Sequence, residues 1–267
     1  MAAAGFRPDL VTSPRAAPVG AGLRTLRLSV AYDGTDYQGW QVQRSAPTIQ
    51  GALVTAAHTL DPAARVIGAS RTDAGVHALA QVASLTISRS LAPSAVMGAL
   101  NAALPRDIRV LNAAEASPGF DARRAARGKR YAYLIDNGPI ARPLLRRYAW
   151  HVPTPLDVTA MRQGLALLRG RHDFSAFCAA PGREKDPVCE VRAMHVVRRK
   201  QRVAILVSAD RFLHHMMRNI VGSLVAVGRG ARAPDWLAGV LASRDRRLAG
   251  PTAPAHGLVL VRVVYPR

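Results

Sequence analysis

Cysteine, lysine and long apolar runs are scarce in this sequence of 267 residues, and each scarcity excludes a class of protein. The two cysteines, Cys178 and Cys189, cannot supply a framework of disulfides or a paired C-x-x-C zinc motif. No uncharged apolar run reaches the roughly 18 residues that a membrane-spanning helix needs. Residues 1–23 lack the apolar core of a secretory signal, and their Ala, Pro and Gly content is typical of a disordered extension. We therefore expect a cytoplasmic protein that does not enter a membrane.

Acidic residues are scarce as well. The chain has 17 Asp and Glu against 37 Lys and Arg, of which three are lysine, and its formal net charge is +20. Arginine usage could reflect codon bias, but that would explain the choice of arginine over lysine and not the excess of basic over acidic residues. A charge of this size attracts polyanions over long distances, and nucleic acid is the first candidate. Because 49% of the residues are hydrophobic, the chain can still build a packed core.

Strand and helix patterns alternate along the chain. Period-two alternation predicts strands at residues 26–32, 81–88, 108–111, 129–136, 190–198, 202–209 and 258–265. Apolar residues at helical spacing predict helices at residues 49–60, 93–104, 158–168, 213–227 and 235–242. This interleaving favours an α/β (α+β) fold, in which helices pack on one face of sheets, over an all-β fold.

Residues 69–78 hold the densest group of reactive side chains. An acid, Asp73, stands among two potential cations and two hydroxyls, just before an apolar strand. Gly75 allows a tight turn there, and Asp73 would lie at a loop tip, where catalytic carboxylates are often found. The alternative is that Asp73 only caps or braces the turn. The local spacing leaves both interpretations open.

Arg218 is the second feature, because it borders the apolar stripe of the helix expected at 213–227. A guanidinium beside a buried face usually needs a partner, and a carboxylate would be the natural one. The alternative is an arginine that extends along its own stem to water.

Basic residues interleave with aromatic ones at 123–133, where Arg130, Tyr131 and Tyr133 occupy a predicted strand. Phosphates bind such cations and bases stack on such rings, although a strand with one half-buried tyrosine and a solvated edge fits equally well. The histidines His214 and His215 have no recognised metal-ligand spacing with other ligand residues, and phosphate-binding and hydrolase motifs are absent. We therefore predict neither a metal nor a cofactor.

Longer stretches of the chain resemble a known family. They read YDGTDYQGWQ at 32–41, TIQG at 48–51, SRTDAGVHA at 70–78, FDAR at 120–123, RY at 130–131, HDF at 172–174 and FLHHMMRNIVG at 212–222. Their order over residues 26–266 is similar to that of bacterial tRNA pseudouridine synthase A. The resemblance implies an isomerase that converts uridine to pseudouridine at positions 38–40 of the tRNA anticodon stem-loop.

The resemblance also assigns roles. Asp73 would be the catalytic carboxylate, acting as nucleophile or base, and Arg218 its ion-pair partner. Tyr131 would stack on the target base and is a candidate for proton transfer. Arg71 would help to extrude that base, while Thr72 and Leu258 would contact the substrate.

The fold implied by the resemblance consists of two similar halves, at residues 24–118 and 119–267. Their mainly antiparallel sheets would join into one continuous sheet, with helices on the outer face and a central basic cleft. The family is homodimeric, and a tRNA would span both subunits. The chain departs from the family pattern at Ser70, where glycine is more common, but the residues that follow it keep their places.

Two other functions were weighed. A non-catalytic RNA-binding or RNA-chaperone protein could keep the same scaffold, although Asp73, Tyr131 and Arg218 are all present. A metal-dependent nuclease would need a cluster of carboxylates, and Asp33 and Asp36 are too few and too dispersed to complete one with Asp73.

Overall fold

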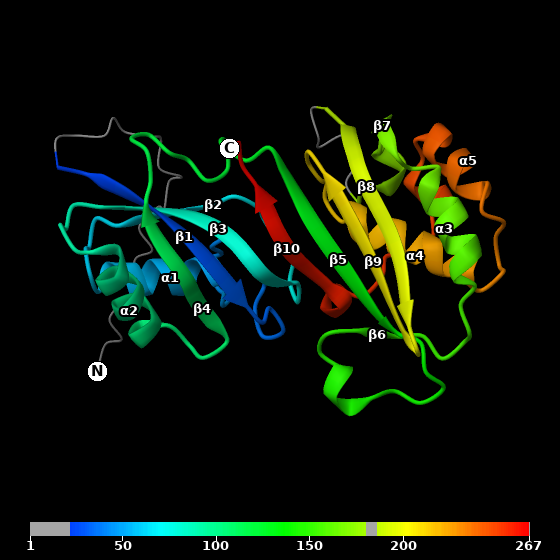
Figure 1. Cartoon of the computed structure of the whole chain (residues 1–267), viewed down its shortest axis with the longest axis horizontal. Coiled ribbons are helices and arrows are strands. Elements are labelled where there is room, and N and C mark those ends of the chain that lie inside the picture. Colours follow the sequence, from blue (N-terminus) through cyan, green and yellow to red (C-terminus); the bar gives the residue numbers. More distant parts are fainter. Residues whose placement is uncertain (1–21, 180–185, 267) are drawn as a thin grey trace, which may run out of the picture.

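The computed structural model describes residues 22–179 and 186–266, so nearly all of the extension predicted to be disordered lies outside the described residues. Within them, ten strands form one sheet, whose main path runs β4-β1-β3-β10-β5-β9-β8-β7. Two short strands lie off this path, β2 beside β3 and β6 beside β5. Figure 1 shows this sheet extending through the whole molecule.

The secondary-structure elements alternate along the chain. The strands are β1 (Arg24–Tyr32), β2 (Arg65–Gly68), β3 (His77–Ile87), β4 (Ile108–Glu115), β5 (Gly128–Asp136), β6 (Trp150–His151), β7 (Gly170–Asp173), β8 (Val188–Arg199), β9 (Arg202–Ala209) and β10 (Leu258–Val264). The α-helices are α1 (Ile49–His58), α2 (Pro93–Ala103), α3 (Val158–Ala166), α4 (Met216–Gly228) and α5 (Trp236–Ser243). The expected mixed fold is confirmed.

The last strand, β10, joins the two parts of the sheet. One part consists of β4, β1, β3 and β2, and the other of β5, β9, β8, β7 and β6. Strand β10 runs parallel to β3, where Val259 pairs with His77, and antiparallel to β5 on its other side. Apart from the short β5–β6 pair, the other pairings in the described residues are antiparallel. A continuous, mainly antiparallel sheet was expected, and the structure confirms it. The division of the chain near residue 118 stays a prediction.

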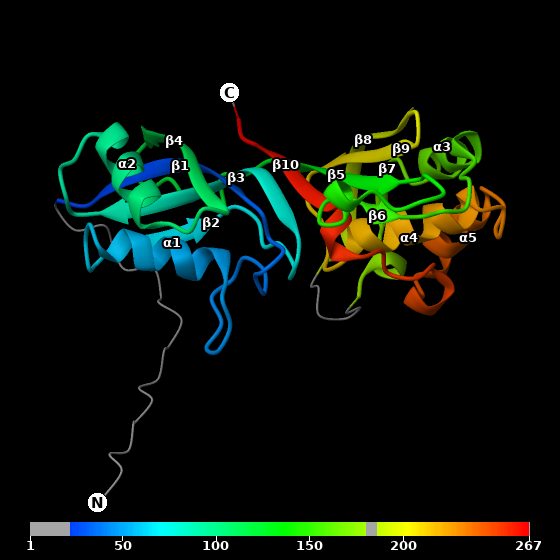
Figure 2. The same ribbon diagram turned by 90° about the horizontal axis from the view of Figure 1, so that it is seen from below.

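The core lies between the sheet and the helices. Leu26, Leu28 and Val30 of β1 are buried, whereas the residues between them are partly or fully exposed, as period-two alternation predicts. Helix α4 is buried along almost its whole length. Figure 2 shows α1, α4 and α5 on the same side of the sheet. None of the described helices is long and apolar enough to cross a membrane.

Two differences from the sequence prediction bear on the site. Strand β3 begins at His77, four residues earlier than expected, so it follows directly on the turn that carries Asp73. Helix α4 begins at Met216 and not at residue 213, because His215 adopts a left-handed backbone conformation with φ of 60°. Strands β2, β6 and β7 were not predicted, since two to four residues are too few for a periodic pattern.

Candidate active site

A cavity of about 610 Å³ lies where the two parts of the sheet meet. Its lining comes from the segment 69–73, from β5, from the residues just before and within the start of α4, and from the first residue of β10. The predicted residues Asp73, Arg71, Thr72, Tyr131 and Leu258 all line it. The fold therefore brings together side chains that lie up to 187 positions apart in the sequence.

Asp73 stands on the turn that precedes β3. The backbone N–H of Val76 donates to the carbonyl of Asp73 at 3.2 Å, and Gly75 takes a φ of 75°, which a residue with a Cβ would resist. The Asp73 side chain is 27% exposed, and among the described residues its carboxylate faces Arg218, His215 and His214 and not its own turn. The turn-bracing alternative left open by the sequence therefore does not describe this side chain.

Arg218 approaches Asp73 from the first turn of α4. Its Nη1 lies 3.4 Å from Asp73 Oδ2, and its Nε donates to the carbonyl of Ala253 at 2.8 Å. The Arg218 side chain is 15% exposed, so the guanidinium is held by these two acceptors and does not extend into water. The guanidinium thus places a positive charge beside the Asp73 carboxylate.

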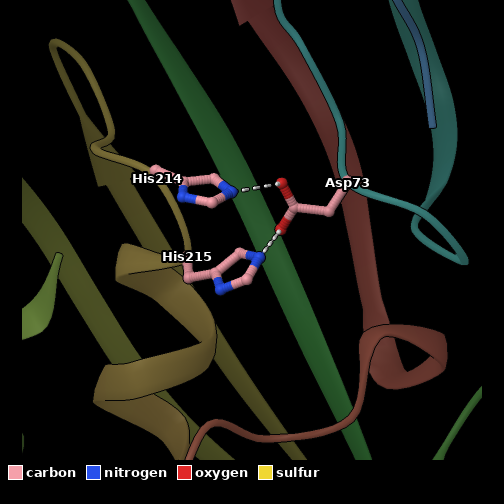
Figure 3. Close-up of side chains that lie close together, drawn as sticks. All are labelled: Asp73, His214 and His215. Atoms are coloured by element: carbon pink, nitrogen blue, oxygen red, sulfur yellow. Dashed lines mark ion pairs between the residues drawn. The ribbon is translucent and has the colours of Figure 1, made fainter. Parts of the chain in front are cut away.

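Two histidines complete the surroundings of Asp73 (Figure 3). His214 Nε2 lies 3.9 Å from Asp73 Oδ1, and His215 Nε2 lies 3.4 Å from Asp73 Oδ2. The two rings lie against each other, with centroids 3.9 Å apart and planes tilted by 33°. Burial lowers the pKa of His215, an effect that the nearby Asp73 opposes and that the neighbouring cations reinforce. His215 is therefore neutral at pH 7.

Asp73, His214 and His215 are also the residues of this site whose side chains resemble a set of metal ligands. The candidate ligand atoms of Asp73, His214 and His215 all lie within 4.8 Å of one another. However, Arg218 already faces the carboxylate, and Arg123 and Lys129 also line the cavity. This excess of positive charge opposes the entry of a divalent cation. The expected absence of a metal stays a prediction.

Tyr131 lies on β5, and its hydroxyl points to Ser70 in the segment that carries Asp73. Its Oη is 3.0 Å from Ser70 Oγ, and its ring meets Phe212 edge to face at a centroid distance of 4.8 Å. Burial raises the pKa of Tyr131 to about 12; the hydroxyl of Ser70 acts against this rise and the charge of Asp73 adds to it. Tyr131 is thus a neutral ring with a fixed hydroxyl at the edge of the cavity.

A buried polar network supports the segment that carries Asp73. Gln81 is fully buried, and its side chain accepts from the backbone N–H of Ser70 and donates to the carbonyl of Ser70 at 2.7 Å. Its amide also reaches Tyr32 Oη, which is 2.8 Å from the hydroxyl of Thr72. Thr72, expected to contact the substrate, is 7% exposed and uses its hydroxyl within this network. Its role toward a substrate stays a prediction.

Arg71 and Leu258 both line the cavity. Arg71 is exposed between the buried residues Ser70 and Thr72, so its guanidinium is free to meet a ligand. Leu258 begins β10 and is 5% exposed. Arg71 thus offers a charge on the solvent side, and Leu258 a small apolar surface.

Sequence reasoning missed several residues of this site. His214 and His215 were considered only as metal ligands, Phe212 was not singled out, and Gln81 was counted as an ordinary strand residue. A polar residue at an inward position of a strand is the signal that could have drawn attention to Gln81. For the histidines, the signal was two adjacent imidazoles at the edge of the apolar stripe that also borders Arg218.

Comparisons with known proteins give one consistent result. A family model described as tRNA pseudouridine synthase matches residues 28–123 and 165–266. The chain is 48% identical over 242 residues to the tRNA pseudouridine synthase A of Myxococcus xanthus, covering 90% of this chain and 91% of that protein. It is 46% identical over 252 residues to the enzyme of the same name from Chloroflexus aurantiacus, covering 91% and 90% of the two chains. For that of Pelobacter propionicus, the identity is 43% over 244 residues, with 91% and 100% covered.

Proposed function

The chain belongs to the tRNA pseudouridine synthase family, and from this premise we propose that it isomerises uridine to pseudouridine at positions 38–40 of the tRNA anticodon stem-loop. The observation that carries the proposal is Asp73, a carboxylate held by Arg218 at the wall of a basic cavity between the two parts of the sheet. The family relationship supplies the isomerisation of uridine in tRNA. The positions within the tRNA come from the resemblance in sequence.

The reaction is an isomerisation in which the atoms of the nucleoside are conserved. The bond between C1′ and N1 breaks, a bond between C1′ and C5 forms, C5 loses its proton to solvent and N1 gains one. No electrons are exchanged with another molecule and no energy donor is consumed. A single carboxylate can divide this change into easier steps, as a nucleophile or as a base. Asp73 has the exposure and the cationic neighbour that such a group needs.

The other side chains fit complementary roles. A stacked base is out of reach of Asp73, so the target uridine must leave the helix stack. Tyr131 offers an aromatic ring on which the extruded base can stack, and Arg71 can occupy the space that the base leaves. Leu258 supplies an apolar wall for the uracil ring. Thr72, whose hydroxyl is bonded to Tyr32, holds the segment that carries Arg71 and Asp73. These roles are those that the resemblance implies, and the position of all four residues on the cavity wall supports them.

The net charge of +20 suits a large polyanionic substrate. We propose that most of the arginines contact phosphates and set the position of the tRNA without reading its sequence. A homodimer is part of the proposal, because the resemblance to the family implies one and a tRNA would then span both subunits. We place the reaction in the cytoplasm, where tRNA is modified. Sedimentation of the free protein tests the dimer, and a monomer at micromolar concentration would contradict it.

Pseudouridine-specific chemical mapping of a tRNA transcript tests the function directly. The transcript is incubated with the protein in a buffer that contains EDTA and no cofactor, and modification is expected at one or more of positions 38–40. Asp73→Asn should abolish it while leaving tRNA binding largely intact. Asp36→Asn is the matched control, because Asp36 is an acid of the same region whose side chain is 70% exposed.

The outcomes separate the alternatives. Modification at other positions would overturn the proposed specificity but not the family activity. Tight binding of tRNA with no modification by the wild-type protein would favour the non-catalytic RNA-binding function. Full activity of Asp73→Asn would remove Asp73 from its role. Binding should also weaken steeply between about 50 and 200 mM salt, since counterions are released from the tRNA.

A further inference from the structure

The two oxygens of the Asp73 carboxylate have different surroundings. Oδ2 faces both Arg218 Nη1 and His215 Nε2, each 3.4 Å away. Among the described residues, Oδ1 has an ion-pair contact only with His214, at 3.9 Å, and the His214 side chain is 49% exposed. One oxygen thus faces two donors that come from the start of α4, and the other faces the more exposed His214; Figure 3 shows the two histidines on separate oxygens.

We propose that His215 is a positioning residue for the carboxylate of Asp73. Together with Arg218 it holds Oδ2, so that Oδ1 is the oxygen presented to the uridine. The proposal rests on the proposed function and adds to it a residue to which no role has been given. His215 acts through Asp73 and need not touch the substrate. Distances of 3.4 Å are long for a hydrogen bond, and such contacts in ligand-free sites commonly shorten when the substrate binds.

The backbone of His215 is the independent reason to single it out. Its φ of 60° places it in the left-handed region, which residues other than Gly, Asn, Asp and His seldom adopt. Strained conformations of this kind cluster at functional sites. In an extended chain, neighbouring side chains point to opposite sides; the left-handed turn at His215 lets both histidines point toward Asp73.

His215 also stands at a position that usually serves another purpose. It is the N-cap residue of α4, where Ser, Thr, Asp or Asn commonly caps the first turn with its side chain. Here the carbonyl of His215 accepts from Asn219 N–H at 3.0 Å, but its side chain makes no capping bond. The imidazole is directed to Asp73 instead. Its lowered pKa keeps the ring neutral, and the tautomer with a proton on Nε2 can donate to Oδ2 without adding a charge.

Three substitutions distinguish the role of the His215 imidazole from that of its left-handed backbone conformation. His215→Gly accepts the left-handed conformation but removes the side chain, and His215→Asn accepts it but carries a donor too short to reach the place of Nε2. His215→Gln carries a donor at about that place. The rate of pseudouridine formation is measured in a single turnover, and the dissociation constant of tRNA is measured separately.

We expect the Gly and Asn variants to react about tenfold to hundredfold more slowly, which is the range for loss of a hydrogen bond to a charged group. Their tRNA affinity should stay within about twofold, and His215→Gln should recover a measurable part of the rate. Lys200→Gly is the control, because Lys200 also has a left-handed φ, 55°, in the exposed turn between β8 and β9. Its rate should equal that of the wild type.

A second measurement does not depend on catalysis. Proton–nitrogen NMR of protein labelled in its histidines reports the tautomer of each ring. We expect the His215 ring to carry its proton on Nε2 and its nitrogen shifts to change in Asp73→Asn, whereas those of His172, remote from the cavity, should stay constant. A rate of wild-type size in the Gly and Asn variants, or a His215 ring that does not respond to Asp73→Asn, would overturn the proposal. A wild-type protein that modifies no tRNA would overturn the proposed function, and the NMR result would still decide whether His215 holds the carboxylate.

Discussion

On one side of the candidate active-site cavity, the segment 70–73 is fixed by neutral, buried hydrogen bonds. On the other side, the segment 213–218 presents cationic or titratable side chains from a strained turn and the first turn of a helix. Gln81 binds both backbone groups of Ser70, and a bond between the hydroxyls of Tyr32 and Thr72 supports the residue next to Asp73. His215 instead carries a left-handed backbone, and the Asp73 contacts of the second side are 3.4 Å or longer.

The difference indicates a division of work. A carboxylate that must meet one atom of a substrate benefits from a rigid support, because small displacements reduce rates strongly. The groups that face it come from a more exposed segment, and their longer contacts leave them room to adjust when a nucleotide enters beside Asp73. We therefore expect substitutions on the first side to act through stability, and substitutions on the second to act on the reaction as well. Helix α4 is an exception, because a substitution at one of its tightly packed positions should lower the stability and the activity together.

Gly222→Ala should have the largest effect. A Cβ at this position of α4 would overlap the carbonyl oxygen of Pro251, in the segment whose Ala253 carbonyl binds Arg218. We expect the free energy of unfolding to fall by about 3 kcal/mol or more, with a matching loss of activity as Arg218 loses its support. Urea unfolding measures the free energy of unfolding, and the rate of tRNA modification measures the activity.

Gly239→Ala is its control. Gly239 lies in α5 with no atom within 4 Å of its would-be Cβ, so alanine should raise the free energy of unfolding by about 0.5–1 kcal/mol. Equal effects of the two substitutions would show that the contact between α4 and the segment 250–253 does not support the site.

Gln81→Leu tests the first side. The substitution removes the partners of the buried N–H and carbonyl of Ser70 and one partner of the Tyr32 hydroxyl. We expect the free energy of unfolding to fall by about 2–4 kcal/mol, because buried polar groups are left unpaired. Gln163→Leu, on an exposed face of α3, should change it by less than about 0.5 kcal/mol. A Gln81→Leu protein as stable as the wild type would mean that the network does not brace the segment.

Ser70 and Tyr131 connect the two parts of the sheet through a single hydrogen bond, and a double-mutant cycle measures it. The cycle uses Ser70→Ala, Tyr131→Phe and their combination, with urea unfolding as the readout. We expect a coupling of about 0.5–1.5 kcal/mol, since either substitution alone leaves a buried hydroxyl without its partner. Ser70→Ala combined with Tyr133→Phe is the control, because the Tyr133 hydroxyl bonds to the Pro254 carbonyl. These two changes should add, and coupling of the same size in both cycles would contradict the specific bond.

The contrast between the two sides also explains what the sequence could predict. Asp73 and Gly75 lie within one short segment, so a turn that presents an acid before a strand was visible from local residue types. The long strands were predicted for the same reason, since period-two alternation is a local signal. The buried edge of the helix around Arg218 likewise indicated that this arginine needs a partner.

The rest depends on tertiary structure. Asp73 and Arg218 are 145 positions apart, and only the resemblance to a family joined them before the fold was known. The left-handed turn at His215 removed the first three residues of the predicted helix, and nothing in the residue pattern marks a histidine for that conformation. The bonds of Gln81 could not be foreseen either, because their partners come from β1 and from the segment 70–72. Local patterns thus located the acid, but not the groups that hold it.

The smallest expected effect concerns a contact between the two parts of the sheet away from the cavity. Tyr148 donates to Asp33 Oδ2 at 2.7 Å, and its ring lies 5.2 Å from that of His77. Burial acts to raise the pKa of Asp33, but hydrogen bonds from Thr35 and Tyr148 outweigh it and the pKa lies below its usual value. A lowered carboxyl pKa stabilises the fold above the pKa of the unfolded chain, about 3.9, and this contribution is lost as the pH falls through the folded-state value.

Tyr148→Phe keeps the ring and removes only the bond to Asp33. Because Tyr148 is 43% exposed, we expect a loss of less than about 1 kcal/mol in the free energy of unfolding near pH 7. The difference between the variant and the wild type should shrink as the pH is lowered below about 4, where Asp33 becomes protonated in both. Urea unfolding at a series of pH values measures this. Curves that stay parallel down to the lowest pH would show that the hydroxyl of Tyr148 does not stabilise the charged form of Asp33, and the contact would then add nothing measurable to the link between the two parts of the sheet.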